Sequence, residues 1–377
     1  MSKTLQDYAT LINDTIQSNE INHYITTDNM CQNLGGIDTL KNINIPQGKV
    51  RSFQKDDVLL SNIRLYFRKV YRAKQKGGCS SDVLVFRAKH IDSATLFAIL
   101  SSQIFTDYAC SGSQGSKMPR GNKTHMMDFK IPTINFTIAK IFNSIQNKIE
   151  NNHKINEILH KILELLYEQY FVRFDFLDEN NKPYQTSGGK MKFSKELNRL
   201  IPSGWSVRFL NHKIVSTYQP KTISKTLLND SYSYSVYGGG GIIGRFTEYN
   251  HEQSEFIISC RGQCGISYLT LPKSWITGNA MVIRPTKSYT SKTYLYHTIK
   301  KYKLTNYITG SVQPQITRQN LSTMPILIPK RKTLNKWNNI SSLLWNLIHN
   351  NMQSTQTLTA LRDFLLPLLL TQQVKPK

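Results

Sequence analysis

The chain has 377 residues, 39% of them hydrophobic, and Lys and Arg outnumber Asp and Glu by 48 to 24. This length suffices for two domains that each bury a core. The net charge of +24 favours a polyanionic partner, with nucleic acid first, and makes its binding salt-dependent. The N-terminus lacks the apolar run of a secretory signal, and no apolar stretch approaches the roughly 20 residues of a membrane span. We therefore expect a cytoplasmic protein with no membrane partner.

Short strands dominate the first predicted domain, residues 1–133. Asp57 to Ser61 has the pattern of an acidic residue, a buried strand and a turn, and Val85 to Arg87 that of a second strand. Both patterns recur in the same order as Glu255 to Ser259 and Val282 to Arg284, at offsets of 198 and 197. An ordered repeat of this length predicts two domains of one fold.

A long helix is predicted after each β-rich domain, at residues 134–172 and 331–371, because apolar residues begin to recur every three and four positions. Seven-residue spacing, typical of a coiled-coil seam, holds in both. The first seam is Ile138, Ile145, Asn152, Leu159 and Leu166, with Ile141, Ile155 and Ile162 beside it; the second is Trp337, Leu344, Asn351, Leu358 and Leu365, with Ile340, Leu347 and Leu361 beside it. We expect an antiparallel pair in which Asn152 and Asn351 bond to each other, unless each simply faces solvent.

The predicted fold class is α+β, with two pseudo-symmetric mixed α/β domains separated by two long helices that form an antiparallel coiled coil. An Asn-, Pro- and Gly-containing linker at 173–200 precedes the second domain, residues 201–330. Such helices would act as spacers between two unlike basic readers, and a duplex target would then be split into two different half-sites.

Several stretches resemble the specificity (S) subunits of type I restriction-modification systems. They are Tyr24 to Met30 with Gly35 to Ile37, the linker segments Lys182 to Tyr184 and Ser187 to Lys190, Tyr237 to Gly244, and Gly310 to Leu321. The resemblance implies two target recognition domains, double-stranded DNA as ligand, and a complex with two methyltransferase (M) subunits and with restriction/translocase (R) subunits. It assigns S-adenosylmethionine, ATP and Mg²⁺ to those partners and no cofactor to this chain.

Catalytic patterns are missing from the sequence. No Pro-Pro pair of an adenine methyltransferase loop occurs, and Gly238 to Gly241 lacks the Lys of a phosphate-binding loop, so we interpret it as a backbone turn. Five scattered cysteines, dispersed histidines and isolated acidic pairs predict neither a metal site nor a nuclease centre. We therefore expect no catalysis in this chain. The open alternatives are a stand-alone DNA methyltransferase or nuclease with an unfamiliar motif, and a coiled-coil scaffold that binds RNA or DNA.

Base edges are read by Arg, Lys, Gln and Asn, and loops rich in these residues are candidates for contact with DNA. We select these residues together with Tyr237 at the glycine-rich turn. The candidates are Asn62, Arg64, Arg68, Lys117 and Arg120 in the first domain, and Tyr237, Arg245, Arg261, Gln263, Gln313, Gln315 and Arg318 in the second.

Overall fold

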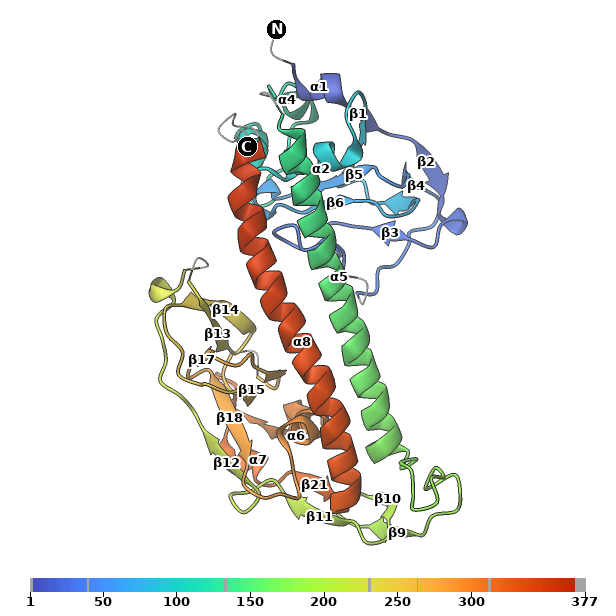
Figure 1. The fold of residues 1–377 in the computed structure, drawn as a ribbon, viewed down its shortest axis with the longest axis vertical. Coiled ribbons are helices and arrows are strands. Elements are labelled where there is room, and N and C mark those ends of the chain that lie inside the picture. The colour runs from blue at the N-terminus through green and yellow to red at the C-terminus, as the bar shows by residue number, and fades with distance from the viewer. Residues whose placement is uncertain are drawn as a thin grey trace. The chain divides into compact units, whose positions relative to one another are not determined.

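The computed structural model describes residues 3–38, 41–131, 134–229, 232–262, 264–310 and 313–369. The chain forms two compact units: unit 1 comprises Met1–Lys154 and Asn351–Lys377, and unit 2 comprises Ile155–Asn350. The long helices α5 (Phe136–Tyr167) and α8 (Arg331–Leu365) each contribute to both units (Figure 1). None of the helices in these described ranges is long and apolar enough to cross a membrane.

Unit 1 is built on an antiparallel sheet of order β1-β8-β5-β6. Its strands are β1 (Ala9–Ile12), β5 (Val58–Ser61), β6 (Val70–Arg72) and β8 (Val83–Ala88). Successive side chains on a strand point to opposite faces. Val58 and Leu60 therefore join the core formed with the helices, whereas Leu59 joins a second core. The surrounding elements are α1 (Leu5–Tyr8), α2 (Ser93–Ser101), α3 (Gln103–Ser111), α4 (Lys123–Met127), and a sheet of β2 (Thr15–Gln17), β4 (Lys49–Phe53), β7 (Gly77–Cys79) and β3 (Tyr24–Ile25).

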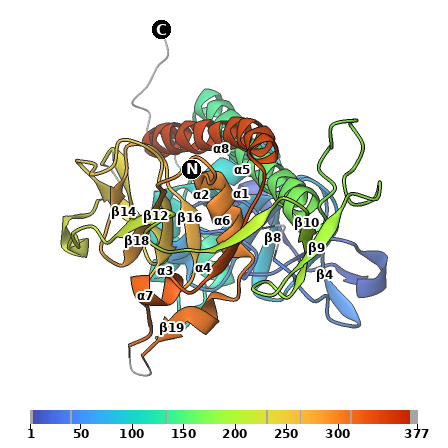
Figure 2. The ribbon, with the colours of Figure 1, turned by 90° about the horizontal axis from the view of Figure 1, so that it is seen from below.

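Unit 2 contains a sheet of the same topology, β12-β18-β15-β16, formed by β12 (Val215–Tyr218), β15 (Phe256–Ser259), β16 (Ser267–Leu269) and β18 (Ala280–Pro285). Helix α6 (Lys292–Lys300) follows β18 and lies against this sheet, as α2 follows β8 in unit 1 (Figure 2). The other elements are β9 (Met191–Ser194), β10 (Arg199–Pro202), β11 (Ser206–Phe209), β13 (Tyr234–Gly238), β14 (Gly241–Phe246), β17 (Trp275–Ile276), β19 (Ile308–Thr309), β20 (Gln315–Ile316), α7 (Arg318–Leu321) and β21 (Pro325–Ile328).

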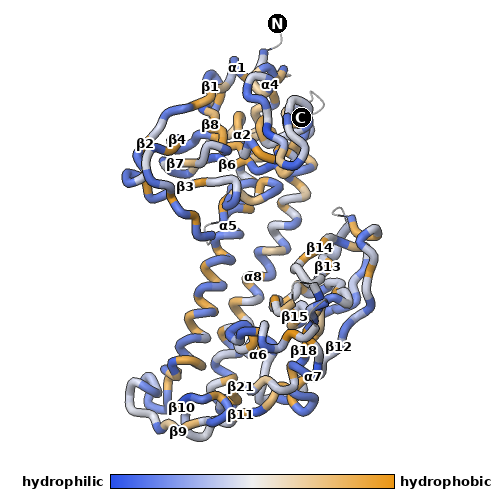
Figure 3. The backbone as a smooth tube through the Cα atoms, turned by 180° about the vertical axis from the view of Figure 1, so that it is seen from behind, coloured by the Kyte–Doolittle hydropathy of each residue, from blue (hydrophilic) through white to orange (hydrophobic). Residues whose placement is uncertain are grey.

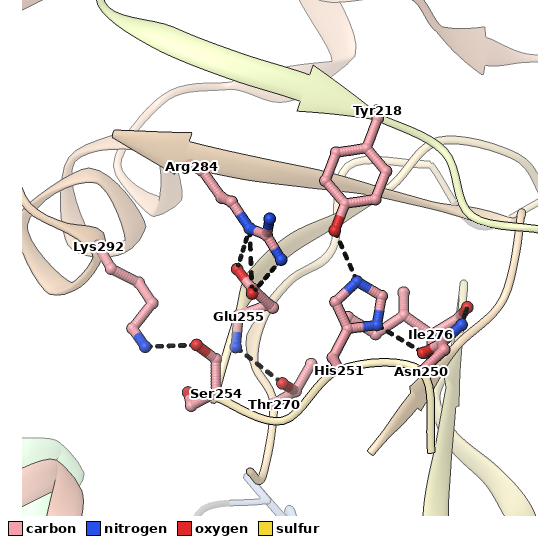
Figure 4. Close-up of polar contacts among 9 residues, drawn as sticks. All are labelled: Tyr218, Asn250, His251, Ser254, Glu255, Thr270, Ile276, Arg284 and Lys292. Atoms are coloured by element: carbon pink, nitrogen blue, oxygen red, sulfur yellow. Dashed lines mark hydrogen bonds and ion pairs between the residues drawn. The ribbon is translucent and has the colours of Figure 1, made fainter. Parts of the chain in front are cut away.

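The same ion pair crosses the central strands of both units. In unit 1, Nε and Nη2 of Arg87 each lie 2.8 Å from an oxygen of the Asp57 carboxylate. In unit 2, Nη2 of Arg284 lies 2.6 Å from Oε1 of Glu255 (Figure 4). These hydrogen bonds raise the pKa of both guanidinium groups. The predicted repeat is thus confirmed, and the acidic residue of each copy pairs with the equivalent arginine.

The long helices run antiparallel in both units. In unit 1, Nη1 of Arg362 donates to Oε1 of Gln146 at 3.1 Å, and Nδ2 of Asn152 donates to Oγ1 of Thr355 at 3.1 Å. Residues later in the sequence of α5 therefore contact residues earlier in the sequence of α8, so the two helices are antiparallel. In unit 2, His160 and Tyr167 of α5 make edge-to-face ring contacts with Trp345 and Trp337 of α8, respectively, so the order of partners is again reversed. The predicted α+β fold with an antiparallel helix pair is confirmed.

The predicted seam is wrong in its second line. Hydrophobic residues recur along both helices (Figure 3), but Ile141, Ile155, Ile162, Ile340, Leu347 and Leu361 are all exposed. The buried line on α5 instead includes Phe142, Ile149 and Leu163, four residues after the first line rather than three. On α8 it includes Ser341 and Arg362. Because positions three and four apart share a helix face, and because polar residues occupy this seam, hydropathy could not identify the buried line.

Asn152 also differs from the prediction. The structure pairs its amide with Thr355 and not with Asn351, because the antiparallel packing places Thr355 opposite it. Its Oδ1 is buried and has no hydrogen-bond partner among the described residues. Register in unit 1 is set more firmly by the buried Arg362–Gln146 contact, since Gln146 in turn donates to the carbonyl of Leu34 at 2.7 Å.

Candidate nucleic-acid interface

In unit 1, three predicted residues lie together on the loops that follow β5 and α3. The backbone N–H of Arg64 donates to the carbonyl of Pro119 at 2.9 Å, and its Nη2 donates to the carbonyl of Lys117 at 3.3 Å. Arg120 is exposed and forms an ion pair of 3.0 Å with Asp82. Two loops far apart in sequence therefore present Arg64, Lys117 and Arg120 on one surface.

Asn62 and Arg68 are not placed on that surface. Asn62 is only 8% exposed, and its backbone N–H donates to the carbonyl of Asp82 at 2.8 Å. Arg68 donates to the carbonyl of Ser101 at 3.0 Å and lies 3.9 Å from the carboxylate of Asp363, and burial lowers the pKa of its guanidinium. Both side chains are largely buried, and as DNA contacts they stay untested predictions.

In unit 2, Arg261, Gln313 and Gln315 line one cavity of about 440 Å³ together with Gly262 and Pro314. Arg261 and Gln315 are joined by an isolated antiparallel bridge. Gln263, the fourth candidate of this loop, lies outside the described residues. An arginine and two amides are hydrogen-bonding groups suited to base edges in the major groove.

The remaining candidates of unit 2 are dispersed. Arg318 begins α7 and lines a different cavity, of about 470 Å³. Arg245 lies on β14, where its guanidinium donates to the carbonyl of Ser233. Tyr237 is buried in the core, its hydroxyl accepts a hydrogen bond from the N–H of Leu271 at 3.0 Å, and burial raises its pKa to about 12. The structure thus places Tyr237 in the core, and its contact with DNA stays an untested prediction.

The glycine run beside Tyr237 is a backbone turn, as predicted. Gly238 and Gly241 face each other as the last pair of the β13–β14 hairpin, and Gly241 has a φ of +97°. A residue with a Cβ adopts such a conformation at a cost, which explains glycine here. The tight turn leaves Tyr237 on the core side of the strand.

The two candidate surfaces are built in the same way. The residue after β5, Asn62, donates from its N–H to the carbonyl of Asp82, and the residue after β15, Cys260, donates to the carbonyl of Asn279 at 3.0 Å. One position further on, Ile63 bridges to Arg120 and Arg261 bridges to Gln315. In each unit the loop after the central strand is thus joined to the segment before the last short helix.

Sequence reasoning missed Asp82, Tyr66 and Met118 at the surface of unit 1. Asp82 is the acceptor of Arg120, while Tyr66 and Met118 are large exposed side chains within two residues of Arg64 and Lys117 in the sequence. For Tyr66 and Met118 this proximity is the available signal. Charge and amide content alone do not single them out.

A second polar cluster in unit 2 is structural. Tyr218 and His251 are joined by a hydrogen bond of 2.7 Å between Oη and Nε2, and Asn250 bonds to both the N–H and the carbonyl of Ile276 (Figure 4). Burial lowers the pKa of His251. These contacts secure β17. Within the described ranges, no His, Cys, Asp and Glu side chains gather in a group of three that could hold a metal ion.

Comparison with known proteins identifies the kind of domain. The family model of the type I restriction modification DNA specificity domain matches residues 202–360. The chain is 22% identical to the type I restriction enzyme MjaIX specificity subunit of Methanocaldococcus jannaschii, over 74% of this chain and 68% of that protein. The crystal structure of the type I restriction-modification system S subunit from M. genitalium has the same fold, with a TM-score of 0.63 and 14% identity over 99% of this chain and 96% of the other.

Proposed function

We propose that this chain, which belongs to the specificity subunits of type I restriction-modification systems, recognises a split duplex DNA target with one unit for each half-site. The observation that carries the proposal is the repeated pair of loops. Each unit joins the loop after its central strand to the segment before its last short helix through an equivalent bridge. The exposed side chains differ between the units, and so the two half-sites should differ.

Unit 1 offers cationic groups at this place, whereas unit 2 offers one arginine and two amides. Arg64, Lys117 and Arg120 can hold phosphates and read guanine. Arg261 suits guanine, and Gln313 and Gln315 suit adenine. We assign the first half-site to the former set and the second to the latter.

Catalysis is assigned to partner subunits. A complex with two methyltransferase subunits and with restriction/translocase subunits would supply adenine methylation through S-adenosylmethionine, and translocation and cleavage through ATP and Mg²⁺. Support for a non-catalytic chain comes from the family, whose members specify the target. We expect the purified chain alone to transfer no methyl group.

The exposed apolar residues of the long helices are our proposed docking surface for the methyltransferase subunits. In unit 2, α5 exposes Ile155, Ile158, Ile162 and Leu165, which share one helix face. Helix α8 exposes Ile340, Leu343 and Leu347 in the same spacing. We expect Ile158→Asp with Leu343→Asp to abolish co-purification of the methyltransferase subunits while leaving the thermal midpoint of the chain within about 2 °C. Retained co-purification would remove this surface from the proposal.

The two-reader proposal is tested with the assembled methyltransferase. Methylated adenines are mapped genome-wide with the wild-type gene, without it, and with two triple-alanine variants, Arg64/Lys117/Arg120 and Arg261/Gln313/Gln315. We expect one split motif that disappears without the gene. The first variant should relax one half of the motif and the second variant the other half. A continuous motif, or relaxation of both halves by one variant, would contradict the assignment of one unit to each half-site.

A further inference from the structure

The turn between β5 and β6 exposes an aromatic side chain at the candidate interface of unit 1. Tyr66 is 52% exposed, although its neighbour Leu65 is buried in the core of the unit. Met118 is 54% exposed and lies between Lys117 and Pro119, the two residues whose carbonyls accept hydrogen bonds from Arg64. Each of these large exposed side chains thus lies within two residues of Arg64 or Lys117 in the sequence.

The turn that carries Tyr66 is held on several sides. Leu65–Phe67 forms one 3-10 turn, and Arg64 and Arg68 at its two ends have φ values of +50° and +49°. Left-handed conformations cost a residue with a Cβ roughly 1 kcal/mol each, so the surrounding contacts must enforce them. The N–H groups of Asn33 and Leu34 donate to the carbonyls of Phe67 and Arg68 at 2.9 and 3.1 Å.

The guanidinium of Arg68 completes this support from the core side through its bond to the carbonyl of Ser101. Tyr66 therefore extends from a preorganised element and loses little freedom when it makes a contact, which is the arrangement expected of a recognition residue.

The charge on the loops that carry Tyr66 indicates the partner. Arg64, two residues before Tyr66, donates to the carbonyl of Lys117, and the side chain of Arg120 is 62% exposed in the same pair of loops. Binding a protein surface here would be unfavourable unless that surface were acidic, because the cations would lose water without gaining anionic partners. Duplex DNA offers phosphates to the cations and apolar base edges to the ring.

Unit 2 repeats the left-handed ends of this turn but not the position of Tyr66. Gly262 and Gly265 have φ values of +75° and +88° in the segment between β15 and β16, at the places of Arg64 and Arg68. Ile266, which is 38% exposed, follows this turn: the N–H of Ser259 donates to its carbonyl, as the N–H of Ser61 donates to that of Lys69. An aromatic side chain inside the turn is therefore a feature of unit 1.

We propose that Tyr66 is a specificity-determining residue, whose ring packs against a base edge of the first half-site while Arg64 and Lys117 hold the flanking phosphates. The inference rests on the proposed function, because it requires that this surface bind DNA. An aromatic ring gives an apolar contact that favours the thymine methyl group over a bare or polar base edge. Tyr66 should then contribute to sequence preference, and Lys117 mainly to general affinity.

The test uses the full chain assembled with its methyltransferase subunits and a library of duplexes of randomised sequence. Tyr66→Ala is compared with Tyr66→Phe and Lys117→Ala, and bound duplexes are sequenced at several salt concentrations. We expect Tyr66→Ala to lose preference at one or two adjacent positions of one half-site, with about a tenfold weaker affinity for the preferred duplex. Tyr66→Phe should keep the preference. Lys117→Ala should weaken binding to all duplexes alike and lower the salt dependence.

The outcomes separate the two levels of the proposal. If Tyr66→Ala keeps wild-type preference at every position, or weakens all duplexes equally, the inference about Tyr66 is overturned while the function stands. If neither the triple-alanine variant of Arg64, Lys117 and Arg120 nor Tyr66→Ala alters any binding, the function assigned to this surface fails. Circular dichroism melting shows whether each variant is folded. Tyr66→Gln, which keeps a large side chain without a ring, provides a second test.

Discussion

Acid should unfold unit 2 through two buried histidines. His297 contacts Trp337 and Tyr167 through its ring, and His349 contacts Trp345. The Nε2 atoms of both are buried and have no hydrogen-bond partner in the described part of the chain. Burial, reinforced by Lys300 for His297 and by Lys292 for His349, lowers their pKa values to about 3 and about 4.

The sign of the effect follows from proton uptake. An unfolded histidine has a pKa of about 6.5, so above that pH both states are neutral and these residues give no pH dependence. As the pH falls below 6.5, both histidines bind a proton in the unfolded chain, whereas in the folded unit they stay neutral until about pH 4 or lower. At pH 5 each histidine therefore costs about 2 kcal/mol of unfolding free energy, together about 4 kcal/mol. That is a large part of the stability of an ordinary domain.

All four tryptophans of the chain, Trp205, Trp275, Trp337 and Trp345, lie in unit 2, so their fluorescence reports this unit alone. Urea unfolding at pH 7.5 and pH 5.0 gives the loss for the wild type, for His297→Phe and for His349→Leu. Each variant should lose about 2 kcal/mol less than the wild type between the two pH values. His212→Gln, at an exposed position, should behave as the wild type does. If the buried-histidine variants show the wild-type pH dependence, the reasoning is refuted.

Three further predictions concern unit 1. Leu366 is 2% exposed in the core of unit 1, so Leu366→Ala should lower the unfolding free energy of unit 1 by about 3 kcal/mol. The loss is measured as reduced hydrogen-exchange protection of the amides on β5 and β8, and unchanged protection would show that the C-terminal segment is dispensable. Asn152→Leu removes an unpaired buried oxygen from the helix pair, so it should stabilise unit 1 by about 1 kcal/mol and raise its thermal midpoint. A lower midpoint would show that the lost hydrogen bond to Thr355 matters more than the unpaired oxygen. Arg68→Ala should leave the salt dependence of DNA binding unchanged, because its guanidinium is buried against Ser101; a salt slope reduced by about one would instead reveal a phosphate contact.

The repeat could be predicted because its carriers obey local rules. Buried strands such as Val58 to Ser61 and Phe256 to Ser259 are short apolar runs between polar residues, and their acidic neighbours recur at a fixed offset. The ion pairs of Asp57 and Glu255 show why those acidic residues recur: each neutralises an arginine on the adjacent strand. Such features depend on neighbours in sequence or in one sheet, which pattern reasoning can reach.

The helix seam and several candidate residues depended on contacts that no local pattern encodes. Arg362 occupies a buried seam position because Gln146 accepts its hydrogen bond, although hydropathy places any arginine outside. The charge of Arg68 favours a contact with DNA, yet its guanidinium donates to the carbonyl of Ser101 from a left-handed backbone position. The glycines that follow Tyr237 indicate an exposed turn, yet the hairpin register puts Tyr237 in the core. In each case a partner distant in sequence decides the environment.

The two units share the main-chain bonds that maintain the fold but differ in the exposed side chains beside them. The backbone bonds after the central strand, from Asn62 to Asp82 and from Cys260 to Asn279, are the same although the side chains at both equivalent positions differ between the units. The exposed apolar side chain on the following segment differs in both type and position, since Tyr66 lies within the turn of unit 1 and Ile266 follows the turn of unit 2. A scaffold fixed by main-chain bonds can exchange its exposed side chains without losing stability. Under the proposed function, a new half-site preference could therefore arise in one unit while the other unit, with its own loops, keeps its target.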